Sequence, residues 1–159
     1  MLFRSVMSHL RKQIRDRIVS NVTGLTTTGS RVYQTRFYPI ASISQPLLLV
    51  YTLSEESEAE TMTRPRKIGR KVSFTLEGMA KATSGLDDTL DAIAKDVEEA
   101  VLADPTCNAL AKDTVLTGTV IDYNAEGEQP VGSIKLTFVV TYRTTEIRSE
   151  EHTSELQSH

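Results

Sequence analysis

The sequence has few of the residues that build disulfide, zinc or thiol chemistry. Cys107 is the only cysteine in 159 residues, so the chain can form no internal disulfide and suits a reducing compartment. His9 is the only histidine before residue 148, whereas a zinc site normally needs several histidine and cysteine ligands. Because Cys107 has no histidine at a recognisable spacing, a nucleophilic role lacks support. We expect no metal and no cofactor.

Long apolar runs and a strong charge of one sign are also missing. The longest wholly apolar run is Leu47–Val50, far short of the ~20 residues that cross a bilayer. Arg4, Arg11 and Lys12 surround a weak apolar segment, so no secretory signal is predicted. The formal net charge is −3, whereas a dedicated nucleic-acid binder usually has a strong basic excess. We expect no membrane partner and no sequence-specific DNA binding.

Residues 148–159 differ from the rest of the chain. They have no apolar periodicity, and the whole segment matches the in-frame translation of a common sequencing adapter. We interpret them as read-through rather than as a disordered polar tail, and we expect the natural C-terminus after Ile147 to be missing. Without Arg148, Glu150, Glu151 and Glu155, the formal charge changes from −3 to −1. Residues 1–147 have the length of one domain.

The clearest structural signal is the segment Ile134–Tyr142. Its apolar residues alternate with Lys135, Thr137, Val139 and Thr141, and they are Ile134, Leu136, Phe138, Val140 and Tyr142. A strand sends successive side chains to opposite faces, so this segment predicts one buried face and one wetter face. Such a pattern favours an antiparallel sheet with helices on one side only.

Four further strands are expected from β-prone or alternating segments, namely Arg31–Tyr38, Pro46–Leu53, Arg70–Glu77 and Val115–Tyr123. Pro39 ends the first of them. The second is strongly apolar, which predicts a place in the centre of the sheet. Gly118 interrupts the last one and suggests a β-bulge or a close backbone neighbour.

Two amphipathic helices are expected. The first spans Ser5–Val22 and has a buried stripe of Val6, Leu10, Ile14, Ile18 and Val22. The second begins with Ser84 as its cap, ends near Ala103, and has a buried stripe of Leu86, Leu90, Ile93, Ala94, Val97 and Val101. The sequence therefore predicts a single α+β domain in the order α-β-β-β-α-β-β, with both helices packed on one face of a mainly antiparallel sheet.

Two blocks of opposite charge flank the connection between the second and third strands. The acidic block is Glu55, Glu56, Glu58 and Glu60, and the basic block is Arg64, Arg66, Lys67, Arg70 and Lys71. We expect a long connecting loop here, and such loops are often functional. The blocks can be contact surfaces for other subunits or solvated loop charges, and both interpretations stay open.

Other charged residues favour simpler explanations. Asp87, Asp88 and Asp91 fit the first turns of a capped helix better than a metal site. Arg64–Lys71 lacks the interleaved aromatic residues of a single-strand binder, and no phosphate-binding glycine loop is present. The basic face of the first helix is more typical of a solvated surface than of a nucleic-acid site. We expect no enzymatic activity.

In order and pattern, most of residues 8–145 resembles the tail terminator proteins of long-tailed bacteriophages, which include the lambda-type minor tail protein U and related tail completion proteins. The resemblance rests on the N-terminal helix and on a series of segments along the chain, namely Arg31-Val32-Tyr33 with Arg36 and Pro39, Gln45–Thr52 with the acidic stretch after it, Arg70–Leu76, Leu86–Asp91, Thr117-Gly118 and Ile134–Tyr142.

The resemblance implies a virion protein rather than an enzyme. A member of this family forms a ring, expected to be a hexamer, at the head-proximal end of the tail, and it is assembled in the bacterial cytoplasm. Its partners would be its own copies, the tail tube protein and a head completion or connector protein. DNA would pass through the lumen without sequence-specific binding. The two charged blocks would then belong to ring or tube contacts.

Two alternatives remain. Within the virion, the chain can be a head–tail connector or a tail tube subunit, because neck and tube proteins share related folds. Outside the virion, it can be a small α+β nucleic-acid-binding module that uses the basic first helix. A small-molecule binding domain has no specific residue in its favour.

Overall fold

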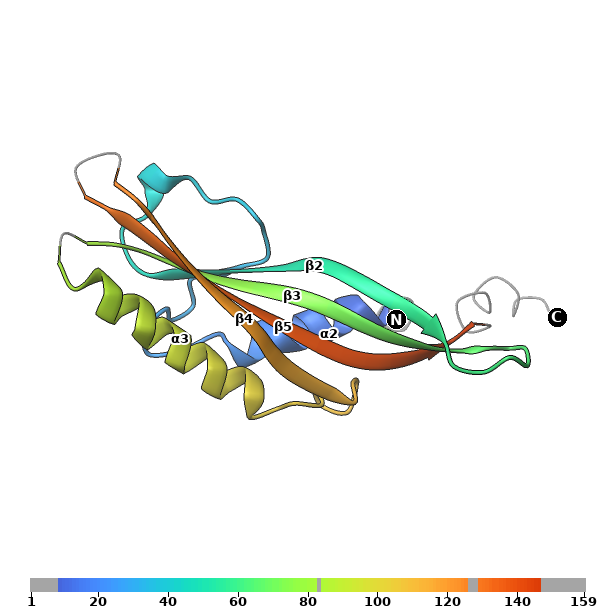
Figure 1. Cartoon of the computed structure of the whole chain (residues 1–159). Coiled ribbons are helices and arrows are strands. Elements are labelled where there is room, and N and C mark those ends of the chain that lie inside the picture. The colour runs from blue at the N-terminus through green and yellow to red at the C-terminus, as the bar shows by residue number, and fades with distance from the viewer. Residues whose placement is uncertain (1–8, 83, 126–128, 147–159) are drawn as a thin grey trace, which may run out of the picture.

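The computed structural model describes residues 9–82, 84–125 and 129–146. In these residues the chain forms a five-stranded sheet with α-helices on one side of it (Figure 1). The elements in chain order are α2 (Leu10–Asn21), β1 (Val32–Tyr33), the 3-10 helix η1 (Ile40–Ser42), β2 (Leu47–Ala59), β3 (Lys67–Lys81), α3 (Leu86–Leu102), β4 (Asp113–Asn124) and β5 (Val131–Thr145). The spatial order is β1-β2-β3-β5-β4, with β1 parallel to β2 and the other pairs antiparallel. The expected α+β class and element order are confirmed.

β3 and β5 form the centre of the sheet. They pair without interruption from Lys67 opposite Thr145 to Lys81 opposite Val131. The inward residues predicted for the last strand are at most 2% exposed, and they are Ile134, Leu136, Phe138, Val140 and Tyr142. The strand therefore has the buried face that its alternating pattern indicates.

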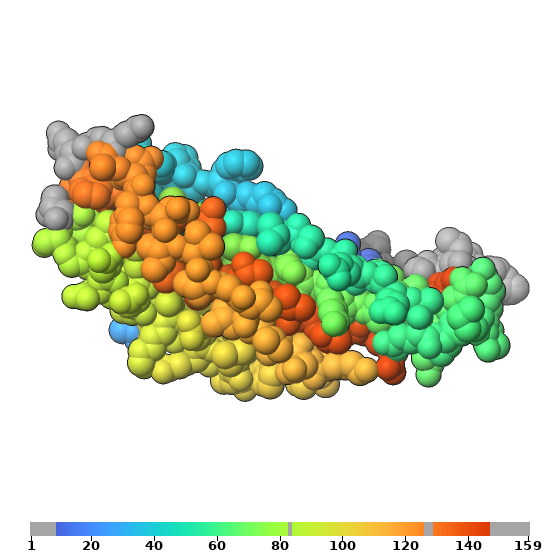
Figure 2. Space-filling view, viewed as in Figure 1, coloured from blue at the N-terminus to red at the C-terminus, as the bar shows by residue number. Residues whose placement is uncertain are grey.

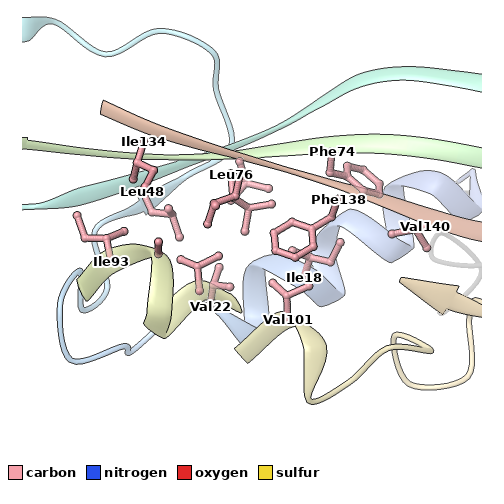
Figure 3. Packing of buried hydrophobic residues seen from close by; sticks show 14 of the residues in the cluster. Ile18, Val22, Leu48, Phe74, Leu76, Ile93, Val101, Ile134, Phe138 and Val140 are labelled. Atoms are coloured by element: carbon pink, nitrogen blue, oxygen red, sulfur yellow. The ribbon is translucent and has the colours of Figure 1, made fainter. Parts of the chain in front are cut away.

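The main core lies between the sheet and the two helices. Phe74 and Phe138 from the sheet pack in one cluster with Ile18 of α2 and with Ile93 and Val101 of α3 (Figure 3). Each fully buried large apolar side chain stabilises the fold by ~1.5–3 kcal/mol. A smaller cluster lies on the opposite face, where the segment between β1 and β2 covers Leu47 and Leu49 (Figure 1).

Both helices begin later than expected. α2 begins at Leu10 rather than at Ser5, because His9 adopts a non-helical conformation and its Nδ1 accepts the Arg11 backbone N–H at 2.9 Å. Residues 5–8 of the expected helix lie outside the described part of the chain. α3 begins at Leu86 after Gly85, which has a φ of 69° and provides no side-chain cap. The prediction that Ser84 caps this helix is therefore wrong.

Two strand predictions also need correction. Of the expected strand Arg31–Tyr38, only Val32–Tyr33 pairs with β2. β2 continues past Leu53 to Ala59, and among the described residues β1 pairs with it only at Leu48 and Leu49. Its second half is therefore an edge of the sheet rather than a central strand.

Polar contacts protect part of this edge. Arg36 donates a hydrogen bond to the Thr52 carbonyl oxygen, and its guanidinium carbon lies 4.9 Å from the centroid of the Tyr51 ring. A register shift separates Thr52 from Ser54.

On the opposite edge, the bulge expected at Gly118 is confirmed by a shift between Leu116 and Gly118.

Phe138 provides a test of the core. We expect Phe138→Ala to lower the free energy of unfolding by ~3–5 kcal/mol, because it leaves a cavity at a fully buried position of the central strand. Leu102→Ala is the matched control, since Leu102 is 41% exposed at the end of α3 and its loss should change that free energy by about 0.5 kcal/mol or less. Denaturant titration followed by circular dichroism measures both, and equal effects would contradict the packing described.

Candidate interaction surface on the β2–β3 hairpin

The two charged blocks form one antiparallel hairpin rather than a long loop. Three of the acidic residues lie in β2 and three of the basic residues lie in β3, and only Glu60, Arg64 and Arg66 fall in the connection. Glu56 is opposite Lys71 in the register. Opposite charges facing each other across an antiparallel pair stabilise the pairing, so the charged residues extend the strands. The hairpin projects from one end of the molecule (Figure 1).

Glu55 joins four elements of the fold. Its Oε2 accepts from Arg11 of α2 and from Arg70 of β3, each with an N–O distance of 2.9 Å. Its Oε1 accepts a hydrogen bond from the Tyr142 hydroxyl of β5. The Glu55 side chain is only 11% exposed, so this carboxylate connects the helix and the central strands inside the protein. Arg70 also donates to Thr144 Oγ1 at 2.8 Å.

The acid–base properties of this cluster follow from its contacts. Burial alone would raise the pKa of Glu55, but hydrogen bonds from Tyr142, Arg11 and Arg70 outweigh burial and hold that pKa below its usual value. Burial and the neighbouring Glu55 carboxylate raise the pKa of Tyr142. Glu55 is therefore a carboxylate and Tyr142 a neutral donor at neutral pH.

Glu60 reaches across the hairpin to the next strand. Its Oε1 lies 2.6 Å from Arg143 Nε of β5. Gly69 leaves room for this path, because a Cβ atom added there would overlap Glu60 Oε2. Beyond it, Arg64 and Arg66 both pair with the Glu146 carboxylate, at N–O distances of 3.3 and 3.7 Å.

The remaining charges of the hairpin face solvent. Glu56, Glu58, Lys67 and Lys71 are exposed, and within residues 9–82, 84–125 and 129–146 none of them forms an ion pair. A hollow of about 180 Å³ lies beside them, lined by Glu56, Glu58, Glu60, Gly69, Lys71 and Thr141, with contributions from Ser57 and Arg70. The nine predicted contact residues thus divide into five with partners inside the chain and four that point outward.

The basic residues of α2 have partners inside the chain. Arg15 donates to Thr52 Oγ1 at 2.6 Å, Arg17 pairs with Asp104 at 2.8 Å, and Lys12 pairs with Asp16 at 2.8 Å. Arg11 pairs with Glu55, so Arg11, Lys12 and Arg17 each have a carboxylate partner that offsets positive charge which a nucleic-acid site on α2 would use.

The other residues that the sequence offered as candidates for a thiol or metal site do not form a site together. Cys107 is buried with its Sγ 3.9 Å from Thr114 Oγ1, and burial raises the pKa of its thiol. Asp87 and Asp88 lie in the first turn of α3, as expected. In the described part of the chain, no group of three or more histidine, cysteine and acidic residues is arranged to hold a metal ion. Neither described α-helix has the length and hydropathy of a membrane span.

Sequence reasoning missed four residues that organise this region, namely Arg11, Tyr142, Arg143 and Glu146. Tyr142 was expected as a core residue, and its hydroxyl contact with Glu55 joins positions that are far apart in the sequence. Only the strand register brings them together. Because the expected second strand ended at Leu53, no pattern in the sequence indicated that Glu55 lies in a strand and is largely buried.

Comparisons with known proteins assign no family. No protein-family profile and no curated protein matches the chain. Among solved structures, the chain is similar to one from "Virion of native gene transfer agent (GTA) particle", with 14% sequence identity and a TM-score of 0.49. The match covers 87% of this chain and 94% of that chain. A similarity at this level assigns no function.

Glu55→Gln tests the cluster at the base of the hairpin. We expect it to lower the free energy of unfolding at pH 7 by about 1–3 kcal/mol, because two arginine groups lose their charged acceptor. The folded-state pKa of Glu55 is lowered, so its contribution is present above the unfolded-state pKa and is lost as the pH falls through the folded-state pKa. Denaturation of both proteins between pH 7 and pH 3 should show the difference shrinking toward acid. A difference that stays constant would contradict this role.

Proposed function

We propose that this chain is a structural protein of a bacteriophage virion, where it forms a ring that caps the tail tube and offers the surface for joining the head. The observation that carries the proposal is the projecting β2–β3 hairpin. Four of its charges point outward, while the others are used to hold the hairpin on the sheet. The resemblance to tail terminator proteins in Gln45–Thr52, Arg70–Leu76 and Ile134–Tyr142 supports the same assignment.

A ring requires two different surfaces on each subunit, because a cyclic assembly is built from heterologous contacts. The hairpin is suited to such a contact. The position of the hairpin is fixed by the ion pairs Glu55–Arg70 and Glu60–Arg143. Little conformational entropy is therefore lost when the hairpin binds a partner. Exposed charges of both signs would set the register with a partner. The role is structural rather than catalytic.

The partners in this proposal are further copies of the chain in a hexamer, the tail tube protein and a head completion or connector protein. The protein would be located in the virion at the head-proximal end of the tail, after assembly in the bacterial cytoplasm. DNA would pass through the lumen, and no sequence-specific contact is proposed.

Electron microscopy of the purified protein tests the proposal directly. Single rings that stop elongation when they are added to the polymerising tube protein of the same virus are the expected result. Long tubes would indicate a tube subunit instead. Rings without effect on tube length would indicate a connector, and a protein that stays monomeric at all concentrations would contradict the proposal.

Exchanging two opposite charges separates folding from assembly. In Glu56→Lys/Lys71→Glu, the two side chains still face an opposite charge across the strands, so stability should stay within about 0.5 kcal/mol of the natural protein. The pattern presented to a partner is reversed, so ring formation or tube capping should fall at least tenfold.

The single variants Glu56→Lys and Lys71→Glu serve as controls. Each places like charges opposite one another and should destabilise the hairpin. Light scattering and thermal denaturation measure assembly and folding separately. Normal assembly and tube capping by the double variant would exclude these residues from the contact.

A further inference from the structure

The tip of the hairpin has an apolar side chain beside basic groups. Met62 is 84% exposed, the highest exposed fraction among the large apolar side chains of the described residues. The Arg64 side chain is 69% exposed although it contacts Glu146, and Lys67 is exposed at the start of β3. We call Met62, Arg64 and Lys67 the hairpin tip. Its chemistry is that of an apolar anchor with a positive rim.

A second surface, with apolar residues beside acidic rather than basic groups, lies where α3 begins. Ile121 and Tyr123 of β4 are 45% and 54% exposed, and the Tyr123 hydroxyl donates a hydrogen bond to Asp87. Asp88 and Asp91 are exposed on the first turns of the same helix. We call Asp87, Asp88, Asp91, Ile121 and Tyr123 the α3 patch.

The Tyr123 hydroxyl contact with Asp87 and the nearby charge of Asp91 place two of the acidic residues beside the apolar part of the α3 patch. Ile121 is opposite Ile134 in the sheet, on the face that packs against the helices. The hydrogen bond to Asp87, slight burial and the charges of Asp87 and Asp91 raise the pKa of Tyr123. The patch is thus an exposed apolar spot with a negative rim.

The hairpin tip and the α3 patch lie at opposite ends of the elongated molecule. Figure 1 places the β2–β3 connection at one end, and the beginning of α3 beside the last residues of β4 toward the other. Figure 2 shows the same separation on the molecular surface, with the green β2–β3 connection at one end and the yellow-green beginning of α3 at the other. The two surfaces cannot meet within one chain, so a contact between them requires a second copy.

We propose that the hairpin tip of one copy docks on the α3 patch of the next, with Met62 against Ile121 and Tyr123 and with Arg64 and Lys67 facing Asp88 and Asp91. The contact is heterologous and head-to-tail, so it leaves one free tip and one free patch on every open assembly. The apolar contact supplies burial, and the rim charges select the orientation. This inference rests on the proposed self-assembly and names the two surfaces that produce it.

A pair of charge reversals tests the contact. The tip variant is Arg64→Glu/Lys67→Glu, and the patch variant is Asp88→Lys/Asp91→Lys. Each should associate at least tenfold more weakly than the natural protein in sedimentation velocity, because like charges then meet at every contact. A one-to-one mixture of the two variants should assemble again, since each reversed surface finds a reversed partner and each natural surface finds a natural one.

Matched variants separate this contact from general effects of charge and folding. Lys112→Glu reverses an exposed lysine outside both surfaces and should associate like the natural protein. Met62→Ser removes the apolar anchor with no change of charge and should weaken association at low and high salt alike. The charge reversals should lose most of their effect at high salt. Thermal denaturation of each variant establishes that it is folded before its association is measured.

The outcomes distinguish the inference from the proposed function. Two variants that each stay monomeric and assemble only when mixed would establish the tip-to-patch contact. If the natural protein forms rings and both variants do so equally well, or if the mixture stays monomeric, the contact is wrong while the proposed ring remains. A natural protein that never associates overturns both.

Discussion

The unbroken pairing of β3 with β5 is the constraint on which the other parts of the structure depend. Each of these strands has 15 residues, and one face of the pair is buried under α2 and α3 for most of its length. A shift of one residue would turn Phe74 and Phe138 away from the core, so the register is strongly specified. The same register places Glu55, Arg70 and Tyr142 within hydrogen-bonding distance. Polar contacts therefore hold the end of the sheet that carries the β2–β3 hairpin. The apolar core sets the strand register that brings the residues of these contacts together.

The sequence predicted most of this architecture because one-sided burial leaves a direct pattern. Apolar residues recur with the period of a strand in Ile134–Tyr142 and with the period of a helix from Leu86 to Val101. Both sets are buried as expected, except that Leu86 is half-buried. The residues at which strands and helices begin and end were harder to predict from the sequence. β2 runs through Glu55 to Ala59 because its charges face Arg70 and Lys71 on β3, a tertiary effect that strand propensity does not contain. The start of α3 depends on the conformation of Gly85 rather than on the nearby serine.

The candidate surface was predicted as a set of residues but not as an arrangement. Sequence position alone groups Glu55 with Glu56, whereas the pleat sends their side chains to opposite faces of the sheet. Glu55 consequently contacts Arg11 and Tyr142, and Glu56 points to solvent. Alternation along the strand could have divided the block in this way. The partners of the inward residues come from α2 and β5, and only the assembled fold identifies them.

The hydrogen bond from Arg36 to the Thr52 carbonyl oxygen has a consequence for how the protein behaves at high concentration. An unpaired strand edge is a template on which foreign strands can grow into insoluble fibrils. The arginine occupies one acceptor of that template and lies over the Tyr51 ring, so an incoming strand must first displace a charged group from its aromatic neighbour. The acidic residues farther along β2 repel a second copy of the same edge. This edge of the sheet therefore resists extension by a second copy of the same strand.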